Sequence, residues 1–229
     1  PGVYEIMNDQ PNLRQFVDEV SSFSDEAPAT PAPAPAKALS PIGEVVEIAG
    51  SGSQIRMDAA TLAALSAHGD PSVEMSGQVG SQVKMVIGNS WLVANVRTMR
   101  AGDNAEIVAN VDFLGEGSRD SAGKLSGFRR GVTRYPIPGS DVFPVTTEDL
   151  RAIFAASDEP HIEIGTVYPT TDIRGALYVD PMLSKHFAIL GSPGTGKSTS
   201  VALILHRISQ LSPEGHIVMI DPHGEYSAA

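Results

Sequence analysis

Between residues 41 and 145 the chain alternates short apolar runs with turns rich in glycine, serine and asparagine. Apolar and polar residues alternate along several of these runs, as in a strand with one face buried. The expected strands cover residues 42–48, 54–57, 79–87, 91–99, 105–114 and 131–137. Short strands separated by such turns predict a small β-barrel over residues 41–145.

Two stretches in and after this region have helical spacing instead. Residues 58–67 predict a short helix with Leu62 and Leu65 inward. A second helix is expected to start at Thr146, which forms a capping pair with Asp149. Its apolar side consists of Leu150, Ile153 and Phe154. The segment 146–185 then connects the barrel to the rest of the chain, with strands expected at 162–168 and 176–179.

The first 40 residues differ from the barrel in pattern and composition. A helical stripe of Leu13, Phe16, Val17, Val20 and Phe23 predicts a short amphipathic helix. Such a helix is either marginal in an otherwise disordered tail or docked to a partner or another subunit. The proline–alanine repeat at residues 27–36 predicts an extended, semi-rigid linker.

The clearest chemical signal comes after residue 186. The apolar run Phe187–Leu190 predicts a buried strand, and it stops at a loop rich in glycine. After Lys197 the apolar residues take helical spacing, so strand, glycine loop and helix follow in order. The spacing from Gly191 to Ser198 fits the phosphate-binding pattern G-x-x-x-x-G-K-[ST].

The residue types in this loop suit a triphosphate. Gly194 and Gly196 let main-chain amides approach the phosphates closely and permit positive φ. The Lys197 ammonium is expected at the β- and γ-phosphates, and the Ser198 hydroxyl on Mg²⁺. The bland alternative is a glycine-rich turn between two elements. The predicted nucleotide-binding residues are Gly191, Ser192, Pro193, Gly194, Thr195, Gly196, Lys197, Ser198 and Thr199.

A second buried strand is expected at residues 216–220. With the loop and helix it would complete a right-handed βαβ unit, which brings the end of this strand to the phosphate edge. Asp221 would then hold Mg²⁺ or its waters, and Glu225 would orient an attacking water or couple to the next subunit. Lys197, Asp221 and Glu225 are thus the candidate catalytic residues, and Ser198 and Asp221 the candidate metal ligands. The alternative is an Asp-Pro turn with surface carboxylates.

Composition further limits the kinds of protein and site that this sequence can form. The chain has 229 residues, no cysteine and a net charge of −11, which excludes disulfides and thiolate zinc sites and argues against a generally basic surface. No apolar run is long enough to span a bilayer, which fits a cytoplasmic protein. Arg129, Arg130 and Arg134 form a local basic cluster, either a solvated surface or a contact for phosphate backbone. The chain begins with proline and stops soon after the second strand, so we expect a fragment of a longer protein.

Three motifs together resemble the HerA-like ATPases of the HerA–FtsK superfamily of DNA motors. They are the loop from Gly191 to Thr199, the pair Lys185-His186 before it, and Asp-Pro-His-Gly-Glu-Tyr at 221–226. The resemblance implies a β plus α/β fold, in which a barrel of the HerA–ATP synthase type precedes the start of a RecA-like P-loop NTPase domain at 186–229. Lys185 stands where relatives often have arginine, and an ammonium cannot make the fork contacts of a guanidinium.

The same resemblance implies an activity. Its members are homohexameric rings that hydrolyse ATP with Mg²⁺ and move double-stranded DNA, in end processing or in phage defence. Their partners would be a NurA-like nuclease or a sirtuin-like effector. The later acidic motif, the arginine finger and the pore loops are expected beyond residue 229, so this fragment alone is expected to bind nucleotide weakly and not to turn over.

Two other functions fit the same pattern. One is a ring ATPase of type IV secretion or conjugation, for which a membrane anchor or a different first domain would be expected. The other is a nucleotide-gated assembly scaffold, in which the barrel is a docking module. DNA-stimulated ATPase activity separates the motor from the scaffold, and duplex against single-strand stimulation separates the two motors.

Overall fold

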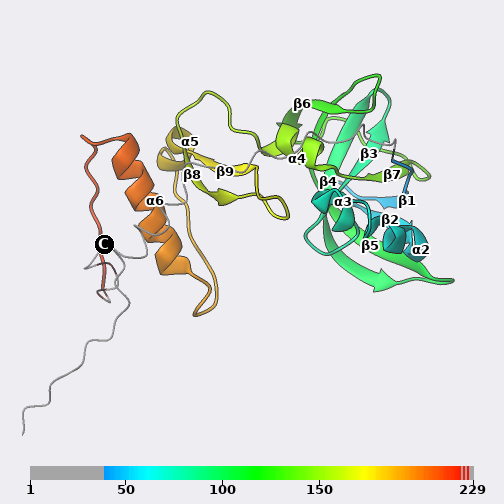
Figure 1. Ribbon diagram of the computed structural model, residues 1–229, viewed down its shortest axis with the longest axis horizontal. Coiled ribbons are helices and arrows are strands. Elements are labelled where there is room, and N and C mark those ends of the chain that lie inside the picture. Colours follow the sequence, from blue (N-terminus) through cyan, green and yellow to red (C-terminus); the bar gives the residue numbers. More distant parts are fainter. Residues whose placement is uncertain (1–38, 223, 225, 227–229) are drawn as a thin grey trace, which may run out of the picture. The chain divides into compact units, whose positions relative to one another are not determined.

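The computed structural model describes residues 39–222, 224 and 226, which divide into two compact units (Figure 1). The barrel unit contains residues 39–157 and 165–175. The loop–helix unit contains residues 158–164, 176–222, 224 and 226. None of the helices in these ranges has the length and apolar character that crossing a bilayer requires.

The barrel unit is a closed antiparallel sheet, as the strand pattern predicts. Its ring follows the order β2-β1-β7-β3-β4-β5, and β5 pairs back to β2. The strands are β1 (Gly43–Ile48), β2 (Gly52–Asp58), β3 (Gln82–Ile87), β4 (Ser90–Ala101), β5 (Glu106–Arg119) and β7 (Asp141–Pro144). A further strand, β6 (Leu125–Arg130), pairs with β5 outside the ring. Closure gives every strand of the ring two neighbours and so leaves the ring without a free edge.

Strand β4 is buried on both faces, which explains its nearly continuous apolar sequence. Leu92, Ala94 and Val96 belong to the core inside the barrel. Trp91 and Val93 point the other way and belong to an outer core, together with Leu150 and Ile173. The outer core is covered by the helix α4 (Thr147–Phe154) and by residues of the 165–175 segment. Burial of one such side chain as large as Leu150 contributes about 1.5–3 kcal/mol.

Helix α4 is fixed at its first turn by the capping box that the sequence predicts. The Thr146 hydroxyl accepts from the Asp149 amide at 3.1 Å, and the Thr146 amide donates to Asp149 Oδ2 at 2.9 Å. The same Oδ2 accepts from Lys84 Nζ of β3 at 2.6 Å, and both of these side chains are buried. Lys84 Nζ also lies 4.7 Å from the centroid of the Trp91 ring. One carboxylate therefore caps α4 and ties it to the barrel wall.

The other short helices of the barrel unit follow local capping signals. Helix α2 (Ala59–Leu65) begins after Asp58, whose carboxylate accepts from the Thr61 amide, and Leu62 and Leu65 pack against the barrel core as predicted. Helix α3 (Pro71–Glu74) was not predicted. Its signal is Asp70 followed by Pro71, an N-cap and a first-turn proline.

The strand predicted at residues 131–137 is wrong. Only Gly131 makes an isolated bridge, to Gly115, and the following residues are irregular. The strands of this part of the chain are β6 and β7 instead. Gly127 has φ +60°, and the β5–β6 register shifts beside it, so the alternation that would mark β6 in the sequence is interrupted.

The loop–helix unit has a small core around one long helix. Helix α6 (Lys197–Leu211) follows the glycine loop, as predicted, and α5 (Val179–Leu183) precedes it. Strands β8 (His161–Thr166) and β9 (Arg174–Tyr178) form a hairpin near the predicted positions, and its turn end at residues 165–175 is part of the barrel unit. The buried core residues of the loop–helix unit are Ile162, Val179, Ile204 and Ile208.

The two strands predicted around the glycine loop do not form. Residues 187–190 and 216–220 are irregular, and Leu190, Val218 and Ile220 are each more than four-fifths exposed. A strand of a parallel sheet takes its hydrogen bonds from neighbouring strands. Among the described residues no strand pairs with either segment. The predicted βαβ unit, and with it a RecA-like sheet, is therefore not formed here.

The helical stripe predicted at residues 13–23, the linker at 27–36 and the candidate residue Glu225 lie outside the described residues.

Candidate functional site

The glycine loop before α6 has the backbone that the motif requires. Gly194 has φ +79° and Gly196 has φ +84°, both in the left-handed region that favours glycine. Nothing lies within 4 Å of a Cβ added at either position, so backbone conformation rather than space explains these two glycines. Successive residues that alternate in this way turn their amides toward one concave side of the chain.

A different reason explains Gly191. A Cβ at this position would lie 2.6 Å from Thr195 Oγ1, closer than real contacts allow. The Thr195 hydroxyl itself donates to the Ser192 carbonyl at 2.8 Å. The loop thus folds back on itself across Ser192, and only a residue without a side chain fits at its start.

Lys197 lies across the same loop. Its Nζ donates to the Ser192 carbonyl at 2.8 Å, so the ammonium is held beside the loop rather than extended into solvent. Sequence reasoning places Lys197 in the site but does not find this contact, because the acceptor is a main-chain oxygen. An anion at the loop would offer the ammonium a charged acceptor in place of a neutral one, and such hydrogen bonds are stronger.

Helix α6 adds its N-terminus to the loop. Its N-cap is Gly196, which supplies no side-chain oxygen for the first-turn amides. These donors and the positive end of the helix dipole therefore lie next to Lys197 and Ser198. The donor set of amides, one ammonium and hydroxyls suits phosphate oxygens. Residues 191–196 are exposed, and Lys197 and Ser198 are half-buried.

Of the two acidic candidates the structure describes only Asp221. Asp221 is half-buried, and its Oδ2 accepts from the Tyr226 amide at 2.8 Å. It therefore caps the turn that follows residue 220, as the alternative interpretation of this motif expects. Within the described ranges no group of three or more His, Cys, Asp or Glu side chains could hold a metal ion. The hydroxyl of Ser198 and the carboxylate of Asp221 remain oxygen ligands of the kind that Mg²⁺ prefers.

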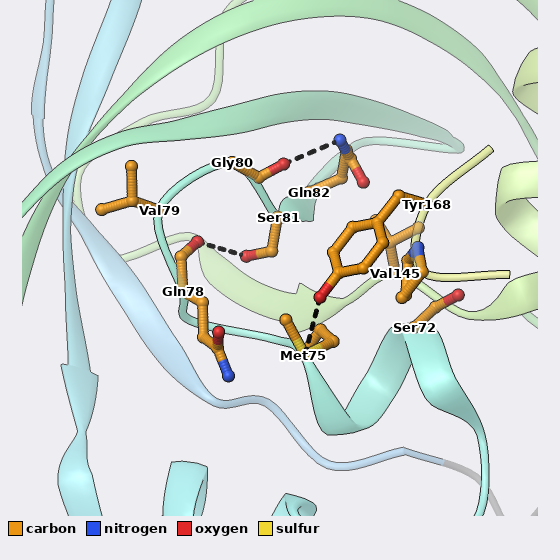
Figure 2. Close-up of a pocket in the computed structure, with 10 residues that line it drawn as sticks. Ser72, Met75, Gln78, Val79, Gly80, Ser81, Gln82, Val145 and Tyr168 are labelled. Carbon is orange, nitrogen blue, oxygen red and sulfur yellow. Dashed lines mark hydrogen bonds between the residues drawn. The ribbon is translucent and has the colours of Figure 1, made fainter. Parts of the chain in front are cut away.

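The barrel unit carries a small cavity of about 90 Å³ between α3, the start of β3 and the Tyr168-Pro169 segment (Figure 2). Tyr168 points toward Met75, with its hydroxyl 3.8 Å from the sulfur, and Ser81 donates to the Gln78 carbonyl at the rim. Pockets for nucleotide-sized ligands measure about 300–1,000 Å³. The cavity is too small for a nucleotide and includes no residue of the glycine loop.

Comparison with known proteins matches the region that holds the loop. Residues 162–229 match the protein family described as the central domain of the helicase HerA. The DNA double-strand break repair helicase HerA of Pyrococcus furiosus is 35% identical over 157 residues, which is 63% of this chain and 26% of that protein. The helicase of the same name from Sulfurisphaera tokodaii is 36% identical over 103 residues, 45% of this chain and 19% of that protein.

A closed β-barrel and a glycine loop that leads into a helix N-terminus define the class of this protein, a barrel joined to a candidate anion-binding unit. Together with the matches, these features make the chain similar to the HerA helicases, with residues 162–229 similar to their central domain. The chain spans about a quarter of the length of the Pyrococcus relative and less of the other.

Proposed function

We propose that this chain carries the barrel and the nucleotide-binding loop of a HerA-type motor that couples ATP hydrolysis to movement along double-stranded DNA. One observation supports this proposal above the others. The residues that match the HerA central domain include the two left-handed glycines and the start of α6. They also include Lys197, which donates to the Ser192 carbonyl. The two relatives reported above are named as DNA double-strand break repair helicases.

In this proposal the loop from Gly191 to Thr199 holds the phosphates of ATP through its amides. Lys197 leaves the Ser192 carbonyl and bonds to the β- and γ-phosphates, and the Ser198 hydroxyl ligates Mg²⁺. Asp221 holds the metal or its waters, and Glu225 orients the attacking water or couples to a neighbouring subunit. Segments 187–190 and 216–220 become strands of a RecA-like sheet, which would bury the apolar side chains that are now exposed.

The wider proposal keeps the expectations drawn from the sequence. The domains are a tail at 1–40, the barrel at 41–145, a connection at 146–185 and the beginning of the ATPase domain at 186–229. The active form is a homohexamer in the cytoplasm that encloses duplex DNA. Its partner is a NurA-like nuclease or a sirtuin-like effector, and its role is DNA end processing or phage defence.

The loop is tested by nucleotide binding to the 229-residue chain, measured as fluorescence anisotropy of a labelled ATP analogue with Mg²⁺. Lys197→Ala removes the ammonium from the phosphates and should weaken binding at least about tenfold. Lys124→Ala is the matched control, because it removes a lysine from the barrel unit, and it should bind as the parent does. Equal binding by parent and Lys197→Ala would remove the loop from the proposal. DNA-stimulated ATPase activity of the full-length protein, lost in Lys197→Ala, tests the motor itself.

A further inference from the structure

The basic residues of the barrel unit fall into two groups. Residues 39–157 contain ten lysines and arginines. Five of them form ion pairs with carboxylates: Arg56, Lys84, Arg97, Lys124 and Arg151. The other five form no ion pair among the described residues: Arg100, Arg119, Arg129, Arg130 and Arg134. Four of these five lie within 16 positions, from 119 to 134.

Backbone pairing brings these four arginines to one end of the barrel. The Arg119 amide donates to the Asn89 carbonyl at 3.1 Å, and Arg134 Nη2 donates to Ser90 Oγ at 3.0 Å, so both lie beside the turn between β3 and β4. Arg129 and Arg130 lie on β6, opposite Glu116 and Gly115 of β5. We call Arg119, Arg129, Arg130 and Arg134 the β6 arginine patch.

Strand β6 offers a free edge in the middle of this patch. It pairs with β5 on one side and with no strand of the described residues on the other, outside the closed ring (Figure 1). Because neighbouring residues of a strand point to opposite faces, Arg129 and Arg130 flank this edge from both sides. Both side chains are exposed, as are Ser126 and Gly127. An anion at the edge can therefore meet two guanidinium groups and main-chain amides together.

The edge is poorly suited to accept another strand. The register shift beside Gly127 and the two charged side chains are devices that prevent strand addition. The exposed residues of β6 also lack the aromatic and Met side chains that are enriched at the centre of protein interfaces. Strand β6 exposes no large apolar side chain, and the nearest exposed ones in the sequence are Tyr135 and Ile137, which follow Arg134. The arginines, with serine, threonine and glycine beside them, supply the side-chain and main-chain donors that contacts to sugar-phosphate backbone use.

Two carboxylates lie close to the patch, Glu116 opposite Arg129 on β5 and Asp120 next to Arg119 in the chain. Glu116 accepts from the Thr133 hydroxyl at 2.6 Å, and this hydrogen bond, with the charge of Arg134 nearby, lowers the pKa of Glu116. It holds the segment after Gly131 against β5 and so positions Arg134. Four arginines outnumber the two carboxylates Glu116 and Asp120, so the patch is positive in a chain whose net charge is −11.

We propose that the free edge of β6 binds the phosphates of duplex DNA through Arg129 and Arg130, with Arg119 and Arg134 at its border. The proposal rests on the proposed function only in taking duplex DNA as the polyanion. The site belongs to the barrel unit and needs neither nucleotide nor Lys197. It gives the barrel a hold on the DNA that is independent of the ATPase cycle.

The test is binding of the 229-residue chain to a short labelled duplex without nucleotide, by fluorescence anisotropy at several salt concentrations. Arg129→Gln/Arg130→Gln should weaken binding about tenfold or more and lower the slope of log affinity against log salt by about 2, as for two lost phosphate contacts. Arg97→Gln/Arg100→Gln removes the same charge from the other end of β4 and should leave affinity within about twofold.

Three further measurements separate the outcomes. Lys197→Ala should bind the duplex as the parent does, so failure of the nucleotide site does not affect this test. Arg129→Lys/Arg130→Lys keeps the charge and should retain most of the salt slope, which covers the case in which the glutamine variant does not fold. A labelled polyglutamate peptide replaces the duplex in a parallel titration. Unchanged duplex binding by the glutamine variant, equal loss in the Arg97/Arg100 control, or equally tight peptide binding lost with the same substitutions would each overturn the proposal.

Discussion

The two units of this chain differ in whether their apolar segments have neighbouring strands to pair with. In the barrel unit every strand of the ring is bonded on both sides, and core residues such as Ile55, Val83 and Leu92 are fully buried. In the loop–helix unit the most buried residues retain slightly more exposure, and two apolar segments form no strand. The barrel ring closes within the described residues, partly by hairpins and partly by long-range pairs such as β1–β7 and β2–β5. Segments 187–190 and 216–220 have no neighbouring strand among the described residues.

The largest expected effect concerns the buried carboxylate that ties α4 to the barrel. Asp149→Ala leaves Lys84 buried without its partner and removes the cap, so the barrel should lose about 3–5 kcal/mol of unfolding free energy. Urea unfolding followed by Trp91 fluorescence measures this, because Trp91 is the only tryptophan of the chain and lies beside Lys84. The double variant Lys84→Met/Asp149→Leu replaces the pair with apolar groups and should recover most of the loss. A loss below about 1 kcal/mol for Asp149→Ala would mean that the pair is not buried in solution.

A smaller effect is expected in the other unit. Gly196→Ala places a Cβ on a residue with φ +84°, which costs about 1–2 kcal/mol in the left-handed conformation. If the loop binds nucleotide in this conformation, affinity for the labelled ATP analogue should fall by about five- to thirtyfold. The Trp91 unfolding transition should not move, because Trp91 belongs to the barrel unit. Gly50→Ala is the control, since no atom lies within 4 Å of a Cβ there. A parent-like affinity for Gly196→Ala would show that this backbone is not the binding conformation.

The smallest expected effect is the pH dependence of the barrel. The hydrogen bond from Lys124, with the charges of Lys124 and Arg151, lowers the pKa of Glu148. A carboxyl with a lowered pKa stabilises the folded state above its unfolded pKa, about 4.3 for glutamate, and this contribution is lost as pH falls through the folded value. Barrel stability should therefore fall below about pH 4.3, and less steeply in Glu148→Gln. The control is Asp103→Asn, which changes an exposed acid that forms no ion pair among the described residues, and its unfolding free energy at each pH should match that of the parent.

Sequence patterns predict the barrel well because apolar and polar residues alternate along its strands and its turns are rich in glycine, serine and asparagine. Strands β1 to β5 and the capping box of α4 lie close to the predicted positions. Strand β6 was missed because a left-handed glycine breaks its alternation, and β7 because four residues carry too little pattern. The segments 187–190 and 216–220 show the opposite failure. Their apolar sequence predicts strands, but both segments are irregular, because a strand also requires a neighbour, which no local pattern supplies.

For the glycine loop, too, some features were predicted from the sequence and others were not. Motif spacing predicts which residues surround the start of α6, and the positive φ of Gly194 and Gly196 confirms the backbone that the motif expects. The contact from Lys197 to the Ser192 carbonyl and the close approach of Thr195 to Gly191 were not predicted, since both involve main-chain atoms or space. The roles of Asp221 and Glu225 remain proposals.

Strand β4 has a consequence for anyone who alters this protein. Its successive residues serve two separate interiors, with Leu92 on one side and Trp91 on the other. A change of side-chain volume in either interior shifts the shared wall, so substitutions on opposite faces of β4 should be strongly non-additive. A substitution that changes side-chain volume on one face of β4 therefore has to be combined with a compensating substitution on the other face.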